Sequence, residues 1–393
     1  MVLEPVDPNA RFHERRANAR RRRKLRRTAF MLALVVSATL GGLAVWMTAR
    51  GAGSPVPEAA KHTTTKTSTK QESLLPKEIR GIHVTMMLAS LPGKLAEYAS
   101  LKNEGLNTIE LDIKDENGTV AFSSPEAPLA GQVGAAGNYY NPSAVAEQLH
   151  ADGIYLIGRV AVFEDPVLSA RRPDLAIQHS DGSAWLDDNG LGWSNEYSKT
   201  VWDYNVSIAK AAAKAGFDEI QFDYVRFPTD GPIESAVWPG KVSESYSNTI
   251  ARFLKYASGQ LKPLGVRVSA DVFGLAATNE LGVGQSPKLM ARYVDALSPM
   301  VYPSHFGPGT YGLTDPQAAP GMTVGYALSD FETAMRGSKA ELVPWIQDFT
   351  MGRKYTLADV QDQILAVRDS SAHGFLIWNA SGEYTPGALQ PAS

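Results

Sequence analysis

Eight short apolar runs recur between residues 78 and 380, and their rhythm limits the fold more than any other feature. They are rich in β-branched and aromatic residues, as buried strands are. The runs are EIRGIHVT (78–85), NTIELDIK (107–114), IYLIGRVAV (154–162), EIQFDYVRF (219–227), VRVSADVF (266–273), ALSPMVYP (296–303), LVPWIQDF (342–349) and GFLIWNA (374–380). Stretches of helical character separate them at 91–104, 142–152, 198–215, 243–264, 287–294, 330–337 and 356–371. Eight alternating β and α units predict an α/β fold, a (β/α)8 TIM barrel.

An open, doubly wound sheet is the alternative architecture. Such a sheet usually has fewer strands and a glycine-rich phosphate turn after the first one. The turn after His83 instead reads MMLASLPG. Glycine closes several of the helical stretches just before the next strand, because it accepts the left-handed conformation that ends a helix. The pattern therefore favours the barrel.

A basic, then apolar, segment precedes the barrel. Residues 1–27 carry ten Lys and Arg against three acids, a net charge of +7. The next run, AFMLALVVSATLGGLAVWMT, has 20 residues without a charge, which is the length that crosses about 30 Å of hydrocarbon as a helix. We predict a basic cytoplasmic tail (1–28), a transmembrane helix (29–48), a flexible linker (49–76) and the barrel (77–393).

The basic flank places the N-terminus in the cytoplasm. The chain is then a single-pass protein of the cell membrane with an extracytoplasmic barrel, and the helix attaches it to the membrane. The alternative is a cleaved signal peptide, for which Gly51-Ala52-Gly53 offers small residues at a cleavage site.

Charge and cysteine content exclude several functions. The whole chain has a net charge of -3, so the part after residue 27 carries -3 minus +7, or -10. That balance argues against nucleic acid as a partner, because nucleic-acid binding needs a basic face. The chain has no cysteine, which excludes disulfides, thiolate metal sites and a cysteine nucleophile.

Asp223 is the sharpest candidate for chemistry. In a barrel the carboxyl ends of all strands meet at one mouth, where enzymes build their sites. Along IQFDYV, Gln221 and Asp223 share one face and the apolar side chains share the other. The apolar face packs on helices, so Asp223 points inward. The alternative is a structural aspartate, ion-paired with Arg226 or Arg159.

Asp271 repeats the pattern on the next strand, where Ser269 and Asp271 alternate with apolar neighbours. Glycoside hydrolysis needs two facing carboxyl groups, one as nucleophile or base and the other as general acid. We therefore predict Asp223 and Asp271 as the catalytic pair.

Other polar and aromatic residues stand near the predicted strand ends and form the candidate substrate-binding set. They are His83, Asp112, Arg159, Arg226, Tyr302, Asp348 and Trp378. The two aromatic rings can stack on sugar faces. Some of these residues have a purely structural role as the alternative. Asp112 can form an ion pair with Lys114 or Arg80, and Asp348 can cap the following turn. Glu164-Asp165-Pro166 reads first as an N-cap or turn.

Other chemistries lack their motifs. The seven histidines show no metal-binding spacing, and the chain has no G-x-S-x-G elbow and no Walker or dinucleotide glycine motif. We therefore predict no cofactor and no metal. A metal held by Asp112, Asp223 and Asp271 stays an alternative without distinctive spacing.

Seven segments in order resemble a bacterial family of glycoside hydrolase domains of the (β/α)8 type, which is uncharacterised and distantly related to α-amylase-like glycosidases. They are RGIHVT (80–85), LNTIELDIKDENG (106–118), IGRVAVFEDP (157–166), GFDEIQFDYVRFPTDG (216–231), SADVFG (269–274), SPMVYPSHF (298–306) and PWIQDF (344–349). The resemblance covers roughly residues 77–385. It implies a barrel glycosidase with Asp223 in the nucleophile position of strand four and Asp271 in the acid position of strand five, where those enzymes usually keep a glutamate.

The segment GFDEIQFDYV also resembles the chitinase signature, but the match fails. Gln221 replaces the middle aspartate of that signature, and Val225 stands where the catalytic glutamate should be. The chain therefore lacks the acid of the chitinase mechanism.

These observations predict a glycoside hydrolase that cleaves an extracytoplasmic polysaccharide or oligosaccharide. Two alternatives stay open. One is a non-catalytic carbohydrate-binding barrel of the cell envelope, and the other is a structural scaffold without an open pocket.

Overall fold

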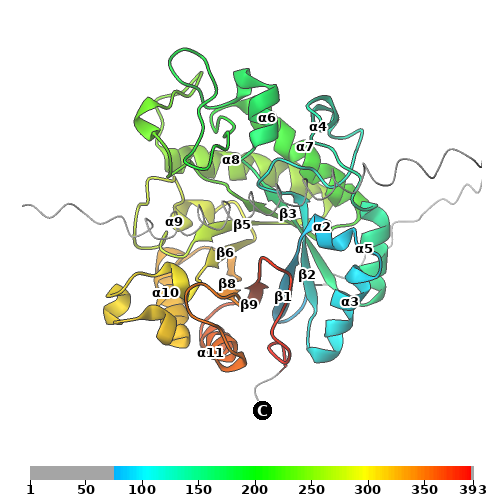
Figure 1. Ribbon diagram of the computed structural model, residues 1–393, viewed down its shortest axis with the longest axis vertical. Helices are drawn as coiled ribbons and strands as arrows, with labels where there is room; N and C mark the ends of the chain where they lie inside the picture. Colours follow the sequence, from blue (N-terminus) through cyan, green and yellow to red (C-terminus); the bar gives the residue numbers. More distant parts are fainter. Residues whose placement is uncertain (1–74, 391–393) are drawn as a thin grey trace, which may run out of the picture. The chain divides into compact units, whose positions relative to one another are not determined.

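The computed structural model describes residues 75–390, and nine parallel strands form its central sheet (Figure 1). They are β1 (Ile79–Val84), β2 (Thr108–Lys114), β3 (Tyr155–Ala161), β4 (Glu219–Asp223), β5 (Arg267–Phe273), β6 (Ala296–Met300), β7 (Glu341–Leu342), β8 (Trp345–Gln347) and β9 (Gly374–Trp378). The order is β5-β4-β3-β2-β1-β9-β8-β6-β7, and pairing of β5 with β6 closes the sheet into a barrel. The predicted (β/α)8 barrel is confirmed.

The seventh position of the barrel holds two short strands, where the sequence predicts one run at 342–349. β7 pairs with β6, and β8 pairs with both β6 and β9. Pro344 lies between them and has no backbone N–H to donate to a neighbouring strand. The prediction of a strand here is correct, but the proline divides it.

Helices surround the strands (Figure 1). The longer ones are α3 (Lys94–Ser100), α5 (Pro142–Ala151), α7 (Lys199–Ala215), α8 (Tyr246–Leu261), α10 (Pro320–Ala334) and α11 (Leu357–Arg368). The shorter ones are α2 (Met86–Ala89), α4 (Pro128–Gln132), α6 (Pro166–Arg171) and α9 (Pro287–Met290). The seven 3-10 segments are η1 (Leu101–Glu104), η2 (Pro173–Leu175), η3 (Ile233–Ser235), η4 (Lys262–Leu264), η5 (Pro303–His305), η6 (Thr310–Gly312) and η7 (Pro316–Ala318).

Several predicted helix boundaries differ from the structure, and the largest difference is at the start of α10. The sequence predicts a helix from residue 330, but α10 already begins at Pro320. Proline is favoured at the first position of a helix because its missing N–H has no partner there. Val324 and Leu328 then bury one helix face. The short helices α2, α4 and α6 have too few residues to show a period and were not predicted.

On β4, apolar side chains face the helices and polar ones face the barrel interior. The ring of Phe222 lies 5.3 Å from that of Phe253 in α8. Its neighbour Gln221 points inward and donates a hydrogen bond to Asp271 of the adjacent strand. The alternation predicted for β4 is therefore confirmed, and it places the acidic residues of the strands inside.

The predicted tail, the transmembrane helix (29–48) and almost all of the linker lie outside the described residues. Within residues 75–390, no helix has the length and apolar character needed to span a membrane.

Gly374 offers a test of barrel closure. It starts β9 opposite Ile79 of β1 with a φ of +133°. A Cβ there would lie 2.1 Å from the Ile79 carbonyl oxygen. We expect Gly374→Ala to lower the free energy of unfolding by about 3 kcal/mol, because backbone must shift at the β1–β9 seam. Urea unfolding measures this change.

Gly153 is the matched control for Gly374. It also has a positive φ, +72°, but no heavy atom lies within 4 Å of a Cβ built there. Gly153→Ala should cost only the strain of the left-handed backbone, about 1 kcal/mol. Equal losses in the two variants would contradict a tight seam at Gly374.

Candidate active site

Strand register sets the polar residues of the barrel interior side by side. His83 of β1 is level with Glu110 of β2, and Asp112 of β2 is level with Arg159 of β3. Because all strands are parallel, these side chains gather toward one end of the barrel. All four are buried, so their charges must be offset by one another.

Arg159 joins three of the acids. Its Nη1 donates to Asp112 Oδ1 at 2.7 Å, and Nε and Nη2 donate to Asp223 Oδ2 at 3.0 and 2.6 Å. Nη2 also lies 3.4 Å from Glu116 Oε2. The Arg159 side chain is only 3% exposed. A buried guanidinium with several charge-assisted hydrogen bonds is held rigidly, so Arg159 fixes the positions of Asp112 and Asp223.

The backbone turns sharply at Asp223, where β4 ends. The next residue, Tyr224, has a φ of +50°, and its N–H donates to Asp223 Oδ1 at 2.7 Å. A left-handed conformation costs a non-glycine residue about 1–2 kcal/mol, and such strain concentrates at functional sites. The Asp223 side chain is 13% exposed, against 3% for Arg159. Asp223 therefore combines a fixed orientation with access to solvent.

Asp271, on the neighbouring strand β5, is buried. Its Oδ1 accepts from Gln221 Nε2 at 2.5 Å and from Trp345 Nε1 at 2.7 Å. Burial raises the pKa of Asp271 well above its ordinary value, and the negative charges of Asp223 and Glu110 raise it further. Within residues 75–390, both hydrogen bonds to the carboxyl end on Oδ1. Oδ2 is thus the oxygen that can carry a proton.

His83 and Glu110 form a second buried pair. His83 Nδ1 is hydrogen-bonded to Glu110 Oε2, and Nε2 lies 3.7 Å from Asp112 Oδ2. Burial lowers the pKa of His83, but the carboxylates of Asp112 and Glu110 outweigh it and raise the pKa overall. Burial raises the pKa of Glu110. Both shifts favour a proton retained between His83 and Glu110, which leaves one fewer free negative charge near Asp271.

Most of the residues predicted from the sequence come together here. This network comprises His83, Asp112, Arg159, Asp223, Asp271, Tyr302 and Trp378. The Trp378 ring lies 4.3 Å from that of His83, and the Arg159 guanidinium carbon lies 5.7 Å from the Trp378 ring centre. Burial raises the pKa of Tyr302, and the charges of Asp271 and Asp223 add to this effect. The network thus places acids beside aromatic rings.

Two predicted binding residues lie apart from the network. The Asp348 carboxylate accepts from Thr385 N at 2.7 Å and from Thr385 Oγ1 at 2.6 Å, so it fastens the segment after β9. Arg226 lies among aromatic rings and donates to the Phe227 carbonyl. Its guanidinium does not contact Asp223.

The structure also decides the ion-pair alternatives. Asp223 and Asp112 both pair with Arg159, not with Arg226, Lys114 or Arg80. Lys114 instead pairs with Asp165 at 2.7 Å, and both side chains are fully buried. Asp165 is the N-cap of α6 and accepts from Leu168 N at 2.8 Å. The N-cap interpretation of Asp165 is confirmed.

Sequence reasoning missed three residues of the site region. Glu110 carries a usable signal, because it alternates with Asp112 in TIELDIK and so shares the inward face. Trp345 carries only a weak signal as an aromatic residue in a strand. Glu196 carries none, since it lies in the long segment at 163–197 that has no period.

Glu196 is a buried acid beside the mouth of the barrel. Its Oε2 accepts from Trp238 Nε1 at 2.7 Å. Burial raises the pKa of Glu196 to about 8, although that hydrogen bond and the charge of Arg226 act in the opposite direction. Glu196 is therefore mostly protonated at neutral pH.

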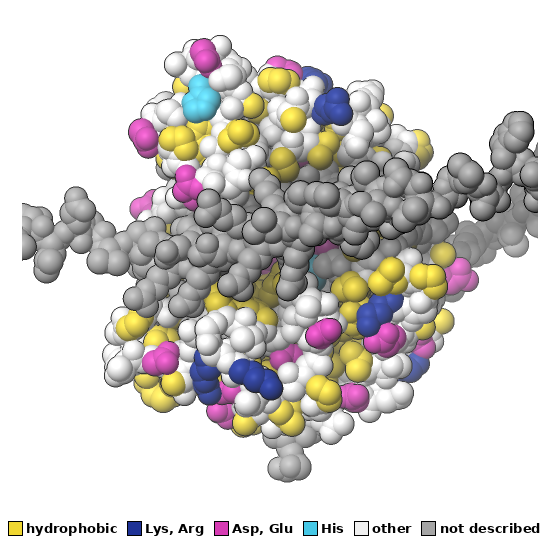
Figure 2. Space-filling view, viewed as in Figure 1, with side chains coloured by type: hydrophobic (Ala, Val, Ile, Leu, Met, Phe, Trp, Pro, Cys, Tyr) yellow, Lys and Arg dark blue, Asp and Glu magenta, His cyan; other side chains and the backbone are white. Residues whose placement is uncertain are grey.

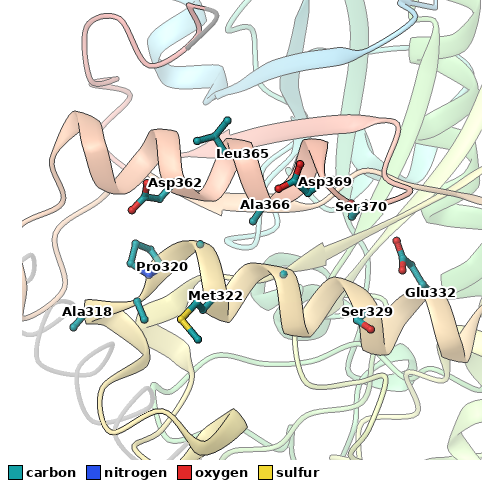
Figure 3. Close-up of a pocket in the computed structure, with 13 residues that line it drawn as sticks. Ala318, Pro320, Met322, Ser329, Glu332, Asp362, Leu365, Ala366, Asp369 and Ser370 are labelled. Carbon is teal, nitrogen blue, oxygen red and sulfur yellow. The ribbon is translucent and has the colours of Figure 1, made fainter. Parts of the chain in front are cut away.

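Outside this network, metal-ligating clusters and grooves add no catalytic candidate within residues 75–390. Within residues 75–390, no cluster of three or more His, Asp and Glu could hold a metal ion. A groove of about 720 Å³ lies between α10 and α11 (Figure 3) and shares no residue with the carboxylate network. On the face shown in Figure 2, Lys and Arg side chains of the described residues are scattered among Asp and Glu.

Comparison with known proteins places this geometry in a family. The model of a family described as "Putative glycosyl hydrolase domain" matches residues 81–384, which includes every strand except the first two residues of β1. The chain belongs to this family. The resemblance seen in the sequence is thereby confirmed. No curated protein sequence matches the chain.

Solved structures include chains similar to this one. A hypothetical protein from Ruminiclostridium thermocellum is 38% identical, with 49% of this chain and 97% of that chain covered and a TM-score of 0.44. The PgaB (BpsB) glycoside hydrolase domain from Bordetella bronchiseptica is 14% identical, with 78% and 95% covered and a TM-score of 0.55. The catalytic domain of a β-amylase from Paenibacillus polymyxa is 13% identical, with 79% and 95% covered and a TM-score of 0.48. The likeness to PgaB shows a shared fold.

The raised pKa of Glu196 predicts a specific pH dependence of stability. The folded protein keeps this proton up to about pH 8, whereas the unfolded chain releases it near the ordinary value of 4.5. The stabilisation is therefore complete below pH 4.5 and is lost as the pH rises to about 8, by up to about 1.4 kcal/mol per pH unit. Because glutamine cannot ionise, Glu196→Gln should become progressively more stable than wild type over this range.

Chemical unfolding from pH 5 to 8 measures this difference. Glu147→Gln, at an exposed position on α5, is the control and should run parallel to wild type. Parallel curves for Glu196→Gln as well would show that Glu196 ionises normally in the folded protein.

Proposed function

We propose that this protein is a glycoside hydrolase that cleaves an extracytoplasmic polysaccharide with Asp223 and Asp271. One observation carries the proposal. Asp223 is ion-paired with Arg159, while burial and the neighbouring charge of Asp223 favour the protonated form of Asp271. An ion-paired carboxylate beside a carboxyl group that keeps its proton is the arrangement that acid-assisted cleavage of a glycosidic bond uses.

Each carboxyl then has one role. Asp271 gives its proton to the glycosidic oxygen as the bond from that oxygen to the anomeric carbon breaks. Asp223 either attacks the anomeric carbon to form a glycosyl ester, which water then cleaves while Asp271 takes the proton of that water, or it removes a proton from the water that attacks directly. Once Asp271 has lost its proton, the hydrogen bonds from Gln221 and Trp345 stabilise the new anion. These donors are in place before the reaction, so little reorganisation is needed.

The aromatic side chains support a carbohydrate substrate. Trp378 is partly exposed and stands at the end of β9, and Tyr302 lies close enough to Asp271 and Asp223 for their charges to act on its hydroxyl. Aromatic rings beside carboxyl groups suit the binding of a sugar ring, because C–H groups pack on the ring face while hydroxyls reach polar side chains. Family membership agrees with this substrate class.

The cellular location is part of the proposal. The +7 flank and the uncharged run at 29–48 support a membrane anchor with the barrel outside. A polysaccharide of the cell envelope is the substrate that an anchored barrel reaches most readily.

A non-catalytic carbohydrate-binding barrel is the second candidate. The deep burial of Asp271 favours it, since a side chain only 2% exposed could serve the packing alone. This candidate predicts glycan binding without product release. The variants described below distinguish this candidate from the hydrolase.

We expect Asp223→Asn to lower kcat/KM by about 10³-fold or more, because the amide is neither a nucleophile nor a base. The amide oxygen still accepts from Arg159, and Arg159 keeps its bonds to Asp112 and Glu116, so the fold should persist. Hydrolysis of envelope polysaccharides by the purified protein, measured as reducing ends per folded molecule, checks this. Asp369→Asn, at an exposed position after α11, should match wild type.

The loss of activity in Asp271→Asn should depend on the leaving group of the substrate. A general acid is needed for sugar leaving groups but not for an aryl group of low pKa. The variant should therefore lose activity on natural glycans and keep much more of it on dinitrophenyl glycosides. An equal loss of activity on both substrates would show that Asp271 is not the general acid. Glycan binding by wild type without any product would favour the binding barrel.

A further inference from the structure

Within the described residues, Arg226 is a buried cation without a carboxylate partner. It is 4% exposed, and its Nη1 donates to the Phe227 carbonyl at 3.1 Å. Among residues 75–390, no Asp or Glu oxygen forms an ion pair with its guanidinium, whereas Arg159 has three acidic partners. An arginine is always charged, and burying that charge unpaired is costly. The fold nevertheless buries this charge close to the strands that carry Asp223 and Asp271.

Aromatic rings hold the guanidinium in place. Its central carbon lies 4.7 Å from the ring centre of Trp193, 4.9 Å from that of Phe273 and 5.3 Å from that of Tyr224. Such cation–π contacts stabilise the charge in part and fix the plane of the group. They offer no hydrogen-bond acceptor in the ring plane. The N–H groups other than Nη1 thus remain available to a ligand.

The position of Arg226 connects it to the proposed catalytic pair. It follows Asp223 by three residues, and Phe273 follows Asp271 by two. The guanidinium therefore lies beyond the ends of β4 and β5, the strands that carry the two acids. None of its nitrogens is among the fully buried side-chain atoms that lack a hydrogen-bond partner, so Nε and Nη2 reach accessible space.

Arg226 lies close enough to Glu196 for its charge to act on that acid, but the larger effect of burial raises the pKa of Glu196. Its pKa of about 8 keeps it mostly uncharged at neutral pH. One of its oxygens, Oε1, is buried without a hydrogen-bond partner within the described residues. Glu196 therefore leaves most of the charge of Arg226 uncompensated at neutral pH.

We propose that Arg226 binds the oxyanion of an acidic sugar, next to the bond that Asp223 and Asp271 cleave. This inference rests on the proposed function and adds the substrate class: a glycan that carries carboxylate or phosphate groups. The planar fork of an arginine matches both anions through two parallel hydrogen bonds. The surrounding rings suit the apolar faces of the same sugar.

Calorimetric binding to the full-length Asp223→Asn variant tests this without turnover. The probes are glucuronate-containing oligosaccharides, their methyl esters and matched oligosaccharides bearing phosphate. We expect the acidic forms to bind about 10- to 100-fold more tightly than the esters. Tighter binding of the carboxylate set would identify a uronate as the ligand, and tighter binding of the phosphate set would identify a sugar phosphate.

Arg226→Met, added to Asp223→Asn, keeps apolar contact with the rings and removes the charge. It should bring the ratio of acid to ester affinity to about one. Arg226→Lys, which keeps the charge without the fork, should retain an intermediate ratio, and it serves as the test if the methionine variant does not fold. Arg252→Met is the matched control, because Arg252 lies 5.4 Å from the Trp202 ring but is already paired with Glu244 at 2.8 Å. Its ratio should equal that of the parent.

Two failures can be told apart. If acidic glycans bind through Arg226 but wild type releases no product, the hydrolase proposal fails and the anion site stands. If wild type cleaves glycans but no acidic form binds better than its neutral ester, or Arg226→Met leaves the ratio unchanged, the anion site is wrong and the hydrolase stands.

Discussion

The fork of Arg159 across Asp112 and Asp223 is the interaction on which the rest of the site depends. It links β2, β3 and β4 at the barrel interior with three hydrogen bonds of 2.6 to 3.0 Å. Without that cation, several buried carboxylates would repel one another at close range in a medium of low dielectric. With it, Asp223 keeps a defined orientation at the rim. The left-handed backbone at Tyr224 then completes the turn that presents this carboxylate to solvent.

Charge balance extends from Arg159 to the other acids. Asp223 and Asp112 share the guanidinium, and His83 with Glu110 retains a proton between them. Within residues 75–390, Asp271 forms no ion pair with a cation, so burial and the charge of Asp223 favour its protonated form. The different roles of two identical side chains thus follow from which one the arginine reaches.

Much of this architecture is visible in the sequence. Eight apolar runs predict eight barrel positions, and strict alternation in IQFDYV predicts that Gln221 and Asp223 face inward. The partners of these side chains on neighbouring strands cannot be predicted in the same way, because they depend on the register between strands and no single run reveals it. The sequence offers two arginines as the ion-pair partner of Asp223, Arg226 and Arg159, and only the register of β3 against β4 selects Arg159. Likewise, the attachment of Asp348 to Thr385 and the burial of Glu196 arise from irregular segments whose path follows no period.

The protonation state of Asp271 tests the account most directly. Carbon-13 NMR of aspartate-labelled protein resolves the carboxyl signal of Asp271, assigned by its loss in Asp271→Asn. The account predicts that this signal keeps the chemical shift of a protonated acid well above the usual titration range of aspartate. It also predicts a lower titration midpoint in Asp223→Asn, which lacks the neighbouring charge. An Asp271 signal that titrates near its ordinary pKa, with or without the charge of Asp223, would contradict the central claim.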